Sequence, residues 1–306
     1  MENMTKLIQN IEKVIVGKSD VVKLAVTCLV AHGNLLIEDI PGTGKTTLAL
    51  AMAKSIQGTF GRIQFTADLL PTDITGVSVY DPEKRTFEFR RGPIFKHLVL
   101  ADEINRGTPR VQSGLLEAMN ERQVSVDGNT YPLPAPFFVI ATQNPLTFAG
   151  TYPLLAAQLD RFLMKIKLGY LSPEDEMAMI KQQKLEHPID SLMPVMSLDE
   201  VLALQKKGRE VVVDDTIYRY VIALVTATRN SPEIRYGISH RGTLSFIAAL
   251  RAHALVAGRS YVMPDDIKKL AVPVLAHRLI QISDHRSHEF AENLIRQLID
   301  TIPVPL

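Results

Sequence analysis

Apolar runs alternate with amphipathic stretches over the first part of the chain. The apolar runs predict strands at residues 34–38, 98–101, 137–141 and 164–168. Between them the apolar positions take helical spacing, as in the helix that we expect from Asp20 towards His32. Ser19 would cap this helix and Gly33 would end it. Because strands that alternate with helices form a parallel sheet between helices, the pattern predicts an α/β domain.

Two segments interrupt this order with alternating apolar and polar positions around a turn. They cover residues 77–89, centred on Asp81 to Lys84, and residues 124–131, centred on Asp127-Gly128. Aspartate, proline and glycine are the residues that tight turns favour. Both segments are therefore predicted to be β-hairpins inserted into the α/β domain.

Helical patterns replace the strand patterns after about His187. Ser197 to Glu200 forms a capping box, and the helix expected from Thr243 ends near Gly258. At about 150 residues per domain, a chain of this length predicts two domains. We expect an α/β domain at residues 1–188 and an all-helical domain at residues 189–306.

Composition narrows the classes of protein. The chain has 34 Lys and Arg against 33 Asp and Glu, so its net charge of +1 gives no general attraction to nucleic acid, and none is expected as a partner. Cys28 is the single cysteine, which excludes an internal disulfide. The start of the chain lacks the apolar segment of a signal peptide, and no apolar run reaches the ~18 residues of a membrane helix. A cytoplasmic protein without membrane insertion is expected.

A glycine-rich loop follows the first predicted strand and leads into a predicted helix. The residues expected to contact nucleotide are Pro41, Gly42, Thr43, Gly44, Lys45, Thr46 and Thr47. Backbone N–H groups of such a loop and the N-terminus of the following helix bind phosphates. Lys45 is expected to reach the β- and γ-phosphates, Thr46 to bind Mg²⁺ and Thr47 to contact the α-phosphate. The loop therefore predicts ATP or ADP with Mg²⁺, although Asp39 stands where the complete motif has glycine.

Two adjacent carboxylates, Asp102 and Glu103, follow the strand predicted at residues 98–101. Ligands of open α/β sheets bind at the carboxyl ends of the strands. We expect Asp102 to hold Mg²⁺ through water and Glu103 to orient or activate the water that attacks the γ-phosphate. Asn144 follows a neighbouring strand and is a candidate to position the same water. Together with the loop, these side chains predict ATP hydrolysis.

Arg161 and Arg241 are candidate cations near the ends of predicted elements, where ordinary surface arginines also occur. Phosphoryl transfer favours such a cation, since an arginine finger contributes roughly 10³ to 10⁵ in rate. His285 and His288 form a further pair, but no cysteine or regular carboxylate cluster accompanies them, so no additional metal site is predicted. Around the serines there is no Ser-His-Asp signature or nucleophile elbow.

In this order the motifs resemble those of the AAA+ ATPases and, more closely, those of the MoxR family. The resemblance extends over nearly the whole chain and is also carried by residues 62–66, 73–76, 92–95, 101–106 and 115–119. It implies an AAA+ P-loop NTPase core with a C-terminal helical lid. The chain departs from the family at Leu155-Ala156, where Pro-Glu is usual, whereas the aspartate at position 39 occurs in some members.

The resemblance also implies roles for individual residues. Val16 and Gly17 would border the adenine, and Asn144 would be sensor 1. Arg161 would be an arginine finger that reaches a neighbouring subunit, and Arg241 would be sensor 2 on the lid. The hairpins would be the helix-2 and pre-sensor insertions. Members form rings, commonly hexamers, and many are thought to be chaperones that mature partners carrying von Willebrand factor A domains.

Three other functions stay open beside a ring-forming ATPase that moves a protein client. A nucleotide-regulated binding module would hold ATP with little turnover, and the altered Leu155-Ala156 keeps it open. A phosphate-loop kinase would need a second substrate pocket under its lid. A nucleic-acid motor lacks support because no basic stripe with aromatic residues occurs.

Overall fold

The computed structural model describes residues 2–145, 150–182, 188–282 and 288–304. Its central sheet has five strands in the order β2-β5-β8-β1-β9, and all neighbours run parallel. The strands are β1 (Leu35–Glu38), β2 (Phe60–Gln64), β5 (Leu98–Asp102), β8 (Phe138–Gln143) and β9 (Met164–Ile166). The predicted parallel sheet is therefore confirmed. The edge strand β2 was not predicted, because its only alternating buried positions are Gly61 and Ile63.

Successive residues of the central strands enter two hydrophobic cores on opposite faces of the sheet. Leu98 and Leu100 of β5 pack in the core that contains α1 (Glu2–Glu12), α2 (Ser19–Val30) and α3 (Lys45–Ser55). Val99 and Ala101 pack in the other core, with α4 (Pro71–Thr75) and α5 (Pro109–Glu121). Helices thus cover both faces. Because all five strands run parallel, their carboxyl ends lie along one edge of the sheet.

The expected caps of α2 are wrong. The helix begins at Ser19 itself, and its N-cap is Lys18, which makes no side-chain capping bond. It ends at Val30, and the left-handed residue after it is His32, with φ of 58°, rather than Gly33. The Gly33 N–H donates to the carbonyl of Cys28, so the chain still turns at this point.

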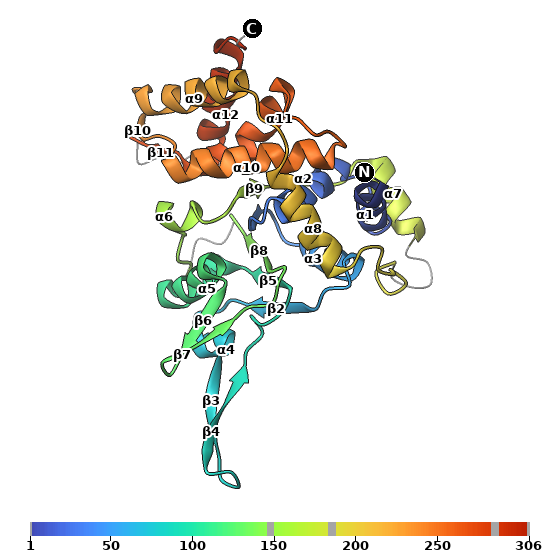
Figure 1. The fold of residues 1–306 in the computed structure, drawn as a ribbon, viewed down its shortest axis with the longest axis vertical. Helices are drawn as coiled ribbons and strands as arrows, with labels where there is room; N and C mark the ends of the chain where they lie inside the picture. The colour runs from blue at the N-terminus through green and yellow to red at the C-terminus, as the bar shows by residue number, and fades with distance from the viewer. Residues whose placement is uncertain (1, 146–149, 183–187, 283–287, 305–306) are drawn as a thin grey trace.

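Both predicted hairpins are present. β3 (Gly76–Asp81) pairs antiparallel with β4 (Thr86–Arg91), and β6 (Gln123–Val126) pairs antiparallel with β7 (Asn129–Pro132). The β3–β4 hairpin projects from the body on the side opposite the C-terminal helices (Figure 1). Near its tip Phe87 is 72% exposed, and its ring lies 5.3 Å from that of Tyr80.

The C-terminal part is helical and covers one side of the sheet domain (Figure 1). Helix α7 (Pro173–Gln182) precedes this part and lies beside α1 (Figure 1). The C-terminal elements are α8 (Leu198–Arg209), α9 (Asp215–Asn230), α10 (His240–Val256), α11 (Pro264–Leu275), the 3₁₀ turn η2 (Ala276–Arg278) and α12 (His288–Thr301). The predicted capping box of α8 is confirmed: Ser197 Oγ accepts from the N–H of Glu200, whose carboxylate accepts from the N–H of Ser197. A short antiparallel pair, β10 (Ile234–Tyr236) and β11 (Ile280–Gln281), was not predicted. In the described part of the chain, no helix has the length and apolarity needed to span a membrane.

Candidate functional site

The glycine-rich loop joins the end of β1 to the start of α3. Gly42 and Gly44 have φ values of 83° and 92°, which glycine adopts without strain. A Cβ at either position would meet no atom within 4 Å, so the space beside the loop is open. The amine of Lys45 lies against the loop, where Nζ donates to the carbonyls of Asp39 at 3.0 Å and Ile40 at 2.5 Å. Burial lowers the pKa of Lys45, and the charges of nearby carboxylates oppose this effect.

Asp39 replaces the first glycine of the motif with a side chain that has three backbone partners. Its Oδ1 accepts from the N–H of Ile40 at 2.8 Å. Its Oδ2 accepts from the N–H groups of Leu168 at 2.7 Å and Gly169 at 2.6 Å. Asp39 does not have a positive φ, so its backbone does not require glycine. The buried carboxylate therefore ties the phosphate loop to the segment that follows β9.

Replacing Asp39 with asparagine should lower the free energy of unfolding by about 1–3 kcal/mol, because the amide nitrogen cannot accept from the N–H groups it would face. Urea denaturation of both proteins measures the effect. Asp190→Asn, at an exposed position, is the matched control. Equal stability of Asp39→Asn and wild type would contradict the role given to this carboxylate.

A cavity of about 370 Å³ opens between the loop and the carboxyl ends of β5 and β8. It is lined by Pro41, Gly42, Gly44, Lys45, Thr46, Thr47, Arg62, Asp102, Glu103, Thr142 and Asn144. We call it the phosphate cavity. The structure thus brings the predicted loop, acidic pair and Asn144 together, although they lie far apart in the sequence.

Asp102 is held by side chains from both neighbouring strands. Its Oδ1 accepts from the hydroxyl of Thr142 at 2.6 Å, and its Oδ2 accepts from Arg62 Nη2 at 2.6 Å. Thr142 is fully buried. Neither Arg62 nor Thr142 was predicted as a site residue, although both lie in segments that carried the motifs. Their contacts depend on the strand order β2-β5-β8, which the sequence patterns did not give.

Glu103 follows directly and has a φ of 54°, a left-handed conformation that is strained for a residue with a side chain. Its N–H donates to Thr142 Oγ1 at 2.8 Å, which holds this backbone in place. Its carboxylate accepts from Gln64 Nε2 at 3.2 Å and from Arg106 Nη1 at 2.9 Å. Residues held in strained conformations cluster at functional sites, so this outlier supports a functional reading of Glu103.

Asn144 lies at the end of the same cavity. It is 9% exposed, and its backbone carbonyl accepts from Asn105 Nδ2 at 3.3 Å. Asn105 follows Glu103 in the 3₁₀ turn η1 (Ile104–Arg106). The segment after β8 is therefore connected to the segment after β5.

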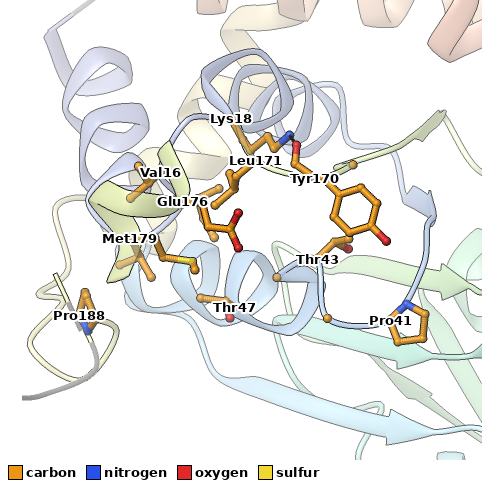
Figure 2. A pocket seen from close by; sticks show the side chains of 15 residues that line it. Val16, Lys18, Pro41, Thr43, Thr47, Tyr170, Leu171, Glu176, Met179 and Pro188 are labelled. Carbon is orange, nitrogen blue, oxygen red and sulfur yellow. Dashed lines mark hydrogen bonds between the residues drawn. The ribbon is translucent and has the colours of Figure 1, made fainter. Parts of the chain in front are cut away.

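A second cavity of about 370 Å³ adjoins the loop on its other side. It is lined by Val14, Ile15, Val16, Lys18, Pro41, Gly42, Thr43, Gly44, Thr47, Gly169, Tyr170, Leu171, Glu176, Met179 and Pro188. We call it the base cavity. Figure 2 shows Glu176 and Met179 of α7 facing the same space as Thr47 of α3. Because the loop lines both cavities, a phosphate chain on the loop and an attached apolar ring could occupy them together.

The predicted border residues of the base fall on this side. Val16 lines the base cavity, whereas Gly17 lines an adjoining one. Gly17 has a φ of 71°, and a Cβ there would lie 2.3 Å from Cγ of Asp175 in α7. Gly17 thus permits the close approach of α7. The lining residues Tyr170 and Glu176 were not predicted, because no local motif marks them.

The donor groups at the phosphate cavity fit Mg²⁺. The hydroxyl of Thr46 and the carboxylate of Asp102 line it, and hard oxygen ligands are those that Mg²⁺ prefers. In the described ranges, no group of three or more His, Cys, Asp or Glu could hold another metal ion. His285 of the considered histidine pair lies outside the described residues.

The two candidate arginines lie outside the two cavities just described. Arg161 follows α6 (Ala156–Leu159) and is half-buried, and Arg241 is in the first turn of α10. Neither lines the phosphate cavity or the base cavity, and Arg241 Nη2 donates to Asn120 Oδ1 at 2.7 Å. Leu155, at the departure from the family pattern, is 65% exposed and is the N-cap of α6.

Comparisons with known proteins agree with this architecture. Residues 34–164 match the ATPase family associated with various cellular activities (AAA), and residues 226–298 match an AAA lid domain. Chaperone MoxR1 of Mycobacterium tuberculosis is 39% identical over 100% of this chain and 83% of its own. Uncharacterized protein YeaC of Bacillus subtilis is 46% identical over 98% of this chain and 94% of its own.

A solved structure shows the same fold over the whole chain. The crystal structure of a candidate ATPase from Cytophaga hutchinsonii superimposes with a TM-score of 0.90 at 34% identity, covering 100% of this chain and 96% of the other. Protein MoxR of Paracoccus denitrificans is 31% identical over 95% of this chain and 93% of its own. The parallel sheet between helices, the C-terminal lid and these relatives agree, and the chain belongs to the MoxR family of AAA+ ATPases.

Proposed function

We propose that the protein binds ATP with Mg²⁺, hydrolyses it, and uses the cycle to remodel or mature a protein partner. The observation that carries the proposal is the phosphate cavity, in which Lys45, Thr46 and Glu103 face one space. The open loop beside it has glycines where phosphate must approach the backbone. The base cavity supports the binding of a complete nucleotide.

In this proposal each side chain has a separate task. Lys45 leaves the loop carbonyls and neutralises the β- and γ-phosphates. Thr46 would hold Mg²⁺ through its hydroxyl and Asp102 would hold it through water, and the ion would supply positive charge against the phosphates. Glu103 orients the attacking water and accepts its proton, and Asn144 positions the same water. Val16 and Gly17 border the base.

We propose that the remaining charge stabilisation comes from a subunit interface. Arg161 would reach the ATP site of a neighbouring subunit, and its position outside its own cavities supports this. Arg241 would act from the lid when the lid closes. Such a contact in trans requires a head-to-tail subunit interface, and we propose that this interface closes into a hexameric ring. The α/β domain at residues 1–188 and the lid at residues 189–306 would then move against each other with the nucleotide.

A chaperone function is proposed because one relative is named a chaperone. The β3–β4 hairpin projects from the body (Figure 1). The aromatic side chains of Tyr80 and Phe87 on this hairpin are exposed. We propose that the hairpins transmit the motion of the ring to the client, which would be a cytoplasmic protein with a von Willebrand factor A domain.

Phosphate release in the presence of Mg²⁺ tests the proposal. Turnover is expected with ATP and Mg²⁺ and should fall to the protein-free level when EDTA removes the metal. Light scattering with ATP and with ADP, on the same preparation, reports the assembly. Absent turnover together with a large change of mass would favour the alternative, a nucleotide-regulated binding module.

A further inference from the structure

A buried arginine of the lid, Arg278, forms hydrogen bonds with the segment that carries Arg161. Arg278 ends η2 and is 7% exposed. Its Nε donates to Asp160 Oδ1 at 2.8 Å, and its Nη2 donates to the carbonyl of Phe162 at 2.7 Å. Its Nη1 also donates to the carbonyl of Leu163 at 3.2 Å. One side chain of the lid thus holds both chain neighbours of Arg161.

Asp160 receives a second contact from the lid, at the start of α10. The hydroxyl of Ser239 donates to Asp160 Oδ2 at 3.4 Å. Ser239 Oγ itself accepts from the N–H of Gly242 at 3.0 Å and caps the helix. A Cβ on Gly242 would lie 3.0 Å from Cδ of Arg278, so the glycine lets α10 approach the arginine. Two elements of the lid therefore converge on one aspartate.

We call the contacts of Arg278 and Ser239 with residues 160–163 the clamp. Its buried cation, Arg278, is paired with one anion, Asp160. A buried cation is costly unless an anion compensates it, and Asp160 lies 2.8 Å from the guanidinium of Arg278. Phe162 is fully buried and leads into β9, which pairs with β1 beside the phosphate loop. The backbone on both sides of Arg161 is therefore tied to buried structure.

Among the residues that the structure describes, the side chain of Arg161 lacks the contacts that hold the residues on either side of it. It is half-buried, and within the described part of the chain its guanidinium has no hydrogen bond or ion pair. It lines neither the phosphate cavity nor the base cavity of its own subunit. A cation on a fixed backbone, unused by its own chain, is available to a group outside it.

We propose that Asp160 and Arg278 are positioning residues for Arg161, and that the lid thereby sets where this cation lies in the neighbouring subunit's ATP site. The inference rests on the proposed function, in which Arg161 acts in trans. Catalytic groups must be held within about 0.5 Å of productive geometry, so a loosened clamp should lower turnover at the ATP site of the neighbouring subunit. ATP binding in the subunit that carries the loosened clamp should stay intact.

The kinetics of Asp160→Ala test whether Asp160 positions Arg161. The expected kcat falls about ten- to a hundredfold, as for a displaced catalytic group, while KM for ATP stays within about twofold. Asp160→Ala combined with Arg161→Ala should be no slower than Arg161→Ala alone, because residues that act through one another are not additive. Glu210→Ala removes an exposed carboxylate at the end of α8 and is the matched control.

Mixed assemblies separate positioning from a merely structural role. Asp160→Ala mixed with Glu103→Gln should regain turnover, because about a quarter of the interfaces in a random equimolar ring join an intact Glu103 to an intact Arg161 segment. Asp160→Ala mixed with Arg161→Ala should regain none, since neither subunit then offers a placed cation. Arg278→Lys, which keeps the charge but cannot contact Asp160 and Phe162 together, should behave as Asp160→Ala does.

Unchanged kcat in Asp160→Ala, losses that multiply with those of Arg161→Ala, or absent rescue by Glu103→Gln would each overturn the inference. Thermal unfolding and assembly mass identify a variant that fails to fold, in which case Asp160→Asn is measured in its place by the same criteria. Wild-type turnover in Arg161→Ala would instead contradict the proposed function, so the two failures are distinguishable.

Discussion

Replacing Glu103 with glutamine is expected to lower ATP turnover by about 10²- to 10³-fold while ATP binding is retained, as for loss of a general base. The amide oxygen can still accept from Arg106, and the N–H of residue 103 can still donate to Thr142. The backbone geometry should therefore survive. What is lost is the ability to take a proton from the attacking water. Phosphate release and the affinity for a fluorescent ATP analogue, measured on one preparation, check both halves of this expectation.

The matched control is Glu117→Gln, on an exposed position of α5. It should turn over ATP at the wild-type rate. If Glu103→Gln loses ATP binding and turnover equally, the carboxylate holds the nucleotide or the fold rather than the water. Turnover equal to wild type would remove Glu103 from the mechanism. Because Glu103→Gln is expected to hold ATP, it should also retain a protein client during affinity capture better than wild type does.

The nucleotide loop was predictable because its geometry is local. Gly42 and Gly44 adopt left-handed conformations that adjacent sequence dictates, and the helix that starts at Lys45 follows directly. The acidic pair was predictable for a similar reason, since a fully buried strand ends beside it. Both hairpins were likewise marked by turn residues within a few positions.

Contacts between distant segments were not predictable from local patterns. Arg62 reaches Asp102 only because β2 lies next to β5, and β2 is an edge strand with few buried positions. In the sequence, Asp39 is only a departure from the glycine of the motif. In the structure, its carboxylate accepts from N–H groups about 130 residues away. Glu176 lines the base cavity through the packing of α7 beside Gly17. Each of these depends on tertiary packing that no local periodicity encodes.

Replacing Arg161 with alanine is expected to lower turnover by about 10³-fold, the lower end of the contribution of an arginine finger. ATP affinity should change little, because Arg161 lines neither cavity of its own subunit. Steady-state phosphate release and ATP-analogue binding measure the two quantities. Arg110→Ala, an exposed arginine in the first turn of α5, is the matched control and should keep the wild-type rate.

Mixing Arg161→Ala with Glu103→Gln decides whether the arginine acts in trans. Each variant alone should turn over ATP slowly, but an Arg161→Ala subunit keeps its own Glu103, and a Glu103→Gln neighbour can supply the missing cation. In a random equimolar ring about a quarter of the interfaces combine the two intact groups, so turnover should rise well above that of either variant. An arginine that acts in its own subunit would give no recovery, because no subunit then contains both groups. Recovery that disappears on dilution, together with the loss of assembly mass, would further tie the active site to the subunit interface.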